Sequence, residues 1–87
     1  MTGDEIHAAR GALGRKWGLG RALGAAELGR ALRLKGRDPG QQVLRWEAGK
    51  SEISGPVSAA IEGWLDGAMP RVPLDEMLTP NGPNLAD

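Results

Sequence analysis

Glycine and proline divide this chain into short segments, and four of the segments have the apolar spacing of a helix. Apolar residues recur every three or four positions in residues 6–17, 25–34, 39–48 and 56–65. Helix starts are indicated by a capping box in residues 2–5, by Asp38 before Pro39, and by Ser54 before residues 55–56. No segment alternates polar and apolar residues as a strand does. The sequence predicts an all-α fold, a compact domain of four to five helices.

The chain is long enough for one domain only. Eighty-seven residues bury about 60% of their unfolded surface, so the stability margin is thin and a dimer partner could contribute to it. We predict one domain over residues 2–69 and a Pro-rich, largely flexible tail over residues 70–87. Within the tail, residues 73–78 could form one helical turn, and the last eight residues are expected to be disordered.

The net charge of zero hides a separation of charge along the chain. Residues 1–50 contain ten basic and five acidic residues, whereas residues 51–87 contain one basic and six acidic residues. One interpretation is a polyanion-binding face with a separate face for oligomerisation or solubility. The other is a chance imbalance on solvated helix faces, and charge alone does not choose between them.

Several classes of function lack the residues they need. The chain has no cysteine, and His7 is its only histidine, so no zinc or thiolate site is expected. The serines have no evident general base, and the glycines do not form a phosphate loop. We therefore expect no enzyme, no cofactor and no metal, and no pocket for a small-molecule effector. No apolar stretch indicates a signal peptide or a membrane span, so the expected location is the cytoplasm.

The third helical segment contains the strongest candidate site. At about 100° per residue, one face of this helix carries Gln41, Leu44, Arg45 and Ala48, and the other carries Val43, Trp46 and Glu47. Glutamine can pair with adenine and arginine with guanine in the major groove of DNA. Gly40 would let the backbone approach a base or phosphate, and Gln42 would lie at the flank. An ordinary polar helix face is the alternative. The three tryptophans lie on apolar stripes and are predicted to be core anchors.

Two stretches of the chain resemble a known family. Residues 25–32 and 42–50, separated by a turn, are similar to the helix-turn-helix of Cro/CI-type (xenobiotic-response-element-type) repressors, which are small phage and bacterial regulators. The most specific part is Arg45-Trp46-Glu47-Ala48-Gly49-Lys50. The resemblance extends over residues 4–67. It implies a lambda-repressor-like domain, usually a homodimer, that places its third helix in the major groove of a palindromic operator.

The resemblance also assigns roles to individual residues. The base-reading positions are Gln41 and Arg45, with Gly40 and Gln42 as neighbouring contacts, and Lys50 is a phosphate contact. Arg10 and Glu47 are predicted to form an ion pair beneath the recognition helix. Two departures change the remaining phosphate contacts. The second helix begins with residues 24–26 as Gly-Ala-Ala instead of Thr-Gln, and the turn over residues 33–39 is long. Backbone amides or Arg21, and Lys35 and Arg37 in the turn, are then the expected phosphate contacts.

Together these features predict a sequence-specific regulator that binds double-stranded DNA. We expect a dimeric autorepressor that occludes a promoter, with a dimer interface formed by Ile61, Trp64, Leu65 and Met69. The competing hypothesis is a helix-turn-helix that binds protein, such as an antitoxin or an adaptor. A repressor needs the polar face of the third helix to be exposed, whereas an adaptor would bury that face against its partner.

Overall fold

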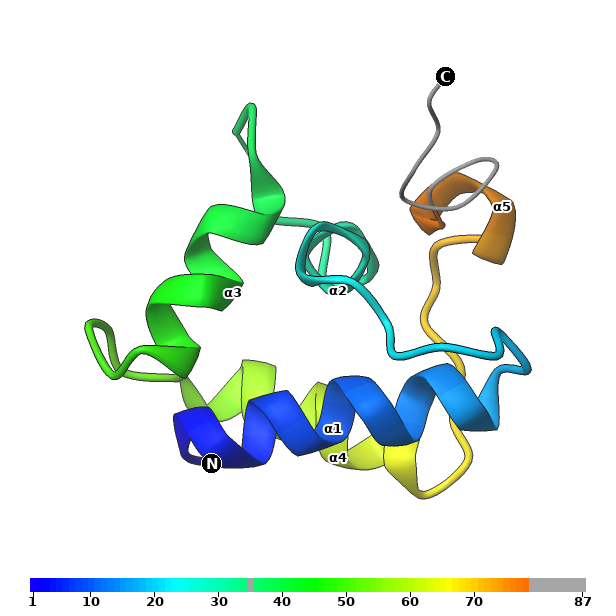
Figure 1. Cartoon of the computed structure of the whole chain (residues 1–87), viewed down its shortest axis with the longest axis horizontal. Coiled ribbons are helices and arrows are strands. Elements are labelled where there is room, and N and C mark those ends of the chain that lie inside the picture. The colour runs from blue at the N-terminus through cyan, green and yellow to red at the C-terminus, as the bar shows by residue number, and fades with distance from the viewer. Residues whose placement is uncertain (35, 79–87) are drawn as a thin grey trace.

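Five helices surround one core in the computed structural model, which describes residues 1–34 and 36–78 (Figure 1). α1 (Gly3–Lys16) and α4 (Gly55–Leu65) lie side by side along one edge, and α3 (Pro39–Glu47) stands at one end of α1. α2 (Ala25–Ala31) lies between α3 and the short α5 (Leu74–Met77). The described residues contain no strand, so the all-α prediction is confirmed.

Side chains before each long helix satisfy its first backbone amides. The Thr2 hydroxyl accepts from the Glu5 amide at 3.2 Å, and the Glu5 carboxylate accepts from the Thr2 amide at 2.7 Å, which completes the capping box. The Asp38 carboxylate accepts from the Gly40 amide at 3.1 Å, and the Ser54 hydroxyl accepts from the Val57 amide at 3.4 Å. The caps inferred from sequence therefore begin α1, α3 and α4.

The core takes apolar residues from every helix and from the loop before α2. These residues are Ile6, Ala9, Leu13, Leu23, Leu28, Ala31, Val43, Trp46, Ile61, Trp64 and Met77. Trp46 and Trp64 are buried, as the apolar stripes predicted. Trp17 caps the end of α1 and is half-buried, with its ring centroid 6.2 Å from that of Trp64. The tryptophans therefore join α1, α3 and α4 around the same interior.

The predicted domain boundary at residue 69 is too early. α5 packs against α2, Met77 is fully buried, and the Arg30 Nε donates to the Met77 carbonyl oxygen at 2.8 Å. Residues 70–78 therefore belong to the domain. The reason is that Met77 joins the same apolar core as Leu28 and Ala31 of α2. The disorder expected for residues 80–87 lies outside the described residues.

Two of the four predicted dimer contacts are also incorrect. Ile61 is fully buried and Trp64 is 8% exposed, so both belong to the core of one chain. The apolar stripe of α4 packs inside the domain and not against a second molecule, because α4 lies against α1. Leu65 is half-buried and Met69 is exposed, so these two retain surface that a second molecule could contact.

Candidate nucleic-acid interface

Two glycines, Gly29 and Gly40, allow α3 to pack very close to α2. A Cβ built on Gly40 would lie 2.8 Å from the backbone nitrogen of Ala26, and one built on Gly29 would lie 2.6 Å from the carbonyl carbon of Pro39. Real side chains do not tolerate such contacts. The two helix backbones therefore touch at glycine, and this contact fixes how α3 sits on the rest of the protein.

The other end of α3 is held to α1 by an ion pair. Arg10 donates from Nε to Oε2 of Glu47 at 2.7 Å and from Nη2 to Oε1 at 3.0 Å. Only 16% of the Arg10 side chain and 14% of the Glu47 side chain are exposed. Arg10 also donates to the Leu23 carbonyl at 3.4 Å, and His7 lies 3.6 Å from Glu47. The pair expected between Arg10 and Glu47 is present, and it ties α3 to α1 and to the loop before α2.

The outer face of α3 is exposed. Gln41, Leu44, Arg45 and Ala48 are all exposed, whereas Val43 and Trp46 on the opposite side are buried. The division of the helix into two faces follows the sequence prediction. Leu44 is 51% exposed, an unusual position for a large apolar side chain. It shares this exposed face with Gln41 and Arg45.

Arg45 is directed partly by the loop after α3. Its Nε donates to the Ser51 hydroxyl at 3.3 Å, a contact that helix periodicity alone does not predict. Among the described residues its two terminal amino groups have no hydrogen-bond or ion-pair partner. Arg45 therefore keeps the forked donor edge with which arginine binds guanine or a carboxylate.

The predicted phosphate contacts have different environments. Arg37 and Lys50 are exposed on either side of α3, at its amino and carboxyl ends. Lys35 lies outside the described residues. Arg21 instead forms a bidentate pair with Glu27, at 2.7 and 2.8 Å, and this interaction raises the pKa of Arg21 above its ordinary value.

Arg21 therefore has a structural role as well. Glu27 is 2% exposed and also accepts from the Gly24 amide at 2.7 Å, so the same carboxylate caps α2. The sequence contains a signal for this arrangement, because Glu27 stands at the third position of α2, where a capping carboxylate belongs. The nearest arginine before it then supplies the counter-charge.

The predicted role of Gly40 as a neighbouring base contact is wrong, whereas the predicted position of Gln42 agrees with the structure. Gly40 is buried against α2, so it is not available to approach a base or phosphate. The absent side chain is needed for helix packing, which the sequence alone does not distinguish from ligand approach. Gln42 is half-buried at the flank of the outer face, as predicted from its angular position.

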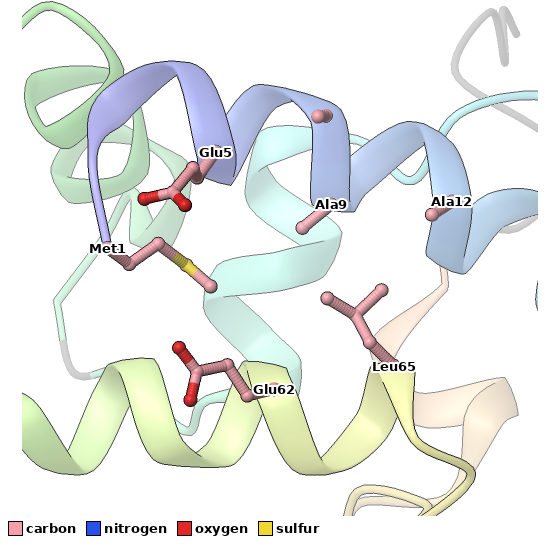
Figure 2. A pocket seen from close by; sticks show the side chains of 7 residues that line it. Met1, Glu5, Ala9, Ala12, Glu62 and Leu65 are labelled. Carbon is pink, nitrogen blue, oxygen red and sulfur yellow. The ribbon is translucent and has the colours of Figure 1, made fainter.

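Two hollows lie on the surface of the described residues, although the sequence predicted no pocket. One, of about 330 Å³, lies between α1 and α4 and is lined by Met1, Glu5, Ala8, Ala9, Ala12, Glu62 and Leu65. Figure 2 shows Glu5 on α1 and Glu62 on α4 projecting toward each other across it. The other, of about 290 Å³, lies beside the end of α2 and contains Arg33 and Arg71. Neither hollow involves the outer face of α3.

In comparisons with known proteins, no family model, no curated protein and no solved structure matches this chain. Within residues 1–34 and 36–78 there is no group of three or more His, Asp or Glu side chains that could hold a metal ion. The described helices are all too short or too polar to cross a membrane.

Proposed function

We propose that this protein binds double-stranded DNA in a sequence-specific manner, with α3 as a recognition helix in the major groove. The observation that carries the proposal is the exposed face of α3, where Gln41, Leu44 and Arg45 lie above a buried Val43 and Trp46. A helix inserted into the major groove needs such a polar outer face on a rigid support. The contacts to α2 and the ion pair to α1 provide that support.

Each exposed residue has a matching chemical partner on a base pair. Arg45 would bind guanine through its unpartnered amino groups, and Gln41 would bind adenine. Leu44, which is 51% exposed, would contact a thymine methyl group, an apolar feature found only in the major groove. Gln42 would contact the groove wall, and Arg37 and Lys50 would bind phosphates on either side.

The proposal extends to a homodimer on a palindromic operator. A nine-residue helix reads only a few base pairs, and a two-fold dimer doubles that number with half-sites about 34 Å apart. Leu65 retains surface for such an interface. Promoter occlusion by a dimeric autorepressor of the Cro/CI type follows as the simplest mechanism for a single small domain.

The test is selection of binding sites from a random DNA duplex pool, followed by titration at several salt concentrations. We expect a palindrome to be enriched and log K to fall with log salt by about 0.9 per neutralised phosphate. Arg45→Ala should lose preference at one base pair, at a cost of about 1–3 kcal/mol. Lys50→Gln should weaken binding to all sequences equally and reduce the salt slope by about one.

An adaptor or antitoxin is the second candidate, and exposed Leu44 is the observation that favours it. A large apolar side chain on an exposed helix face is also what a protein partner would cover. Binding to DNA that is weak and insensitive to sequence would reject the DNA proposal. Loss of partner binding on Leu44→Asp, with Ala59→Asp as an exposed control on α4, would then support the adaptor.

A further inference from the structure

The hollow beside the end of α2 combines an apolar wall with two arginines. Leu32, Ala60, Trp64 and Met69 contribute to the wall, and Arg33 and Arg71 supply the charge. These residues come from the end of α2, from α4 and from the segment that follows α4. At about 290 Å³ the hollow is at the lower limit of size for sites that bind small organic molecules.

Neither arginine of this hollow has a partner in the described part of the chain. Arg10 and Arg21 are paired with carboxylates, and Arg30 donates to a backbone carbonyl. The side chains of Arg33 and Arg71, by contrast, form no hydrogen bond or ion pair with any described residue, and both residues are exposed. Two like charges at one apolar hollow repel each other, and an anion placed between them would relieve that repulsion.

The backbone of Arg33 provides an independent observation. α1, α2, α3 and α4 all end in the same turn, in which the amide two residues after the C-cap donates to the carbonyl five residues before it. This turn needs a positive φ at the residue after the C-cap. Three of the helices place a glycine there, Gly18, Gly49 and Gly67, but α2 places Arg33 with φ of 61°. An arginine is strained where glycine is not.

The chain contains 14 glycines, yet this position holds Arg33 in a strained conformation, and Arg33 lines the hollow. Strain held at one residue is a common property of binding sites. We propose that this hollow binds a small organic anion that has a carboxylate on an apolar body. The carboxylate lies between Arg33 and Arg71, since arginine pairs well with planar carboxylates. The apolar body lies against Trp64 and Met69.

The hollow between α1 and α4 does not share this chemistry. Its charged side chains are those of Glu5 and Glu62, which would repel an anion (Figure 2). The Glu5 carboxylate is already bonded to the Thr2 amide in the capping box. The proposed site is also separate from the outer face of α3, so it does not depend on whether the protein binds DNA.

The test uses octanoate, with two matched probes. Acetate has the same carboxylate without the apolar body, and octanamide has the apolar body without the charge. Binding to the full-length protein is measured by titration calorimetry and by the indole N–H resonances of the tryptophans. We expect octanoate to bind at one site, at least about tenfold more tightly than either probe, because each probe lacks one half of the interaction. The Trp64 resonance should shift and the Trp46 resonance should not.

Variants then locate the site. Arg33→Gly restores the residue that the other helices use at this position, so it should fold with an unchanged or higher midpoint of thermal unfolding. We expect Arg33→Gly and Arg71→Gln each to weaken octanoate binding by at least about tenfold. Arg37→Gln, an exposed cation outside the hollow, should leave binding unchanged.

Three results would overturn the proposal. They are equal binding of octanoate and octanamide, wild-type affinity in Arg33→Gly and Arg71→Gln, or equal losses in all three variants, which would indicate non-specific attraction to positive charge. DNA selection is a separate measurement. If octanoate binds as expected but no DNA site is enriched, only the DNA-binding function is rejected.

Discussion

Some arginines of residues 1–50 are paired with a carboxylate and have a structural role, and others remain available to a ligand. Arg10 is held by Glu47 and Arg21 by Glu27, and both carboxylates are at least mostly buried. Arg45 has only a hydroxyl at its Nε, so its charge is not neutralised within the described residues. The available charge of this surface is therefore smaller than a count of basic residues indicates, and Arg37, Arg45 and Lys50 are the part of it that lies on or beside α3.

Glu47→Gln should destabilise the protein by about 3 kcal/mol, because Arg10 would keep its charge in a site where only 16% of its side chain is exposed. Urea unfolding measures this change. Glu52→Gln, an exposed residue just after α3, should change stability by less than about 0.5 kcal/mol. The double variant Arg10→Met with Glu47→Met should cost less than the sum of the two single changes. Additive losses would show that the pair contributes no coupling.

At the scale of the helix, glycine has opposite effects at two positions. Gly40 lies at the contact with α2, where a Cβ would meet backbone at 2.8 Å, whereas a Cβ on Gly63 of α4 would meet nothing within 4 Å. Gly40→Ala should therefore destabilise the protein, and Gly63→Ala should stabilise it by about 0.5–1 kcal/mol through helix propensity. Thermal unfolding of both variants tests this. A gain in stability for Gly40→Ala would mean that α2 and α3 do not pack at this glycine.

The capping box of α1 predicts a dependence on pH. A hydrogen bond from the Thr2 backbone amide lowers the pKa of Glu5 below its ordinary value of 4.5. Because the folded pKa is the lower one, the carboxylate contributes stability above pH 4.5 and loses it as the pH falls through the folded pKa. The stability difference between wild type and Glu5→Gln should therefore be largest near neutral pH and shrink on acidification. A difference that is constant with pH would exclude this role.

The helices could be predicted from residues close together in the sequence, whereas the incorrect predictions concern contacts between helices. Asp38, Pro39 and Ser54 begin helices through contacts within three residues, so the sequence contains the whole cause. The faces of α3 follow from periodicity in the same way. The burial of Gly40 and Ile61 depends on which helix lies opposite each of them. The sequence of α4 alone does not show that α4 packs against α1. The same limit applies to the arginine hollow, whose residues come from three separate segments.

At the scale of the whole molecule, a short fifth helix completes the core. α5 has four residues and no side-chain cap, so it is held by packing and not by its own propensity. Met77 is fully buried against α2, and the Arg30 Nε bonds to its carbonyl at 2.8 Å. Because α2 supports α3 from the other side, the position of the candidate recognition helix depends on a residue that lies 30 positions beyond its last residue, Glu47.

Met77→Ala should accordingly lower the free energy of unfolding by about 3 kcal/mol, since it removes a fully buried side chain and leaves a cavity next to α2. Glu76→Ala, at the adjacent exposed position, should change it by less than about 0.5 kcal/mol. Urea unfolding followed by tryptophan fluorescence and by far-ultraviolet circular dichroism distinguishes two arrangements of the chain. If α5 belongs to the cooperative unit, both signals shift together to a lower urea midpoint, because Trp46 and Trp64 lie in the same core as Met77. If residues 70–78 were an appendage, Met77→Ala would leave the fluorescence midpoint where it is in Glu76→Ala, and the domain would end before α5.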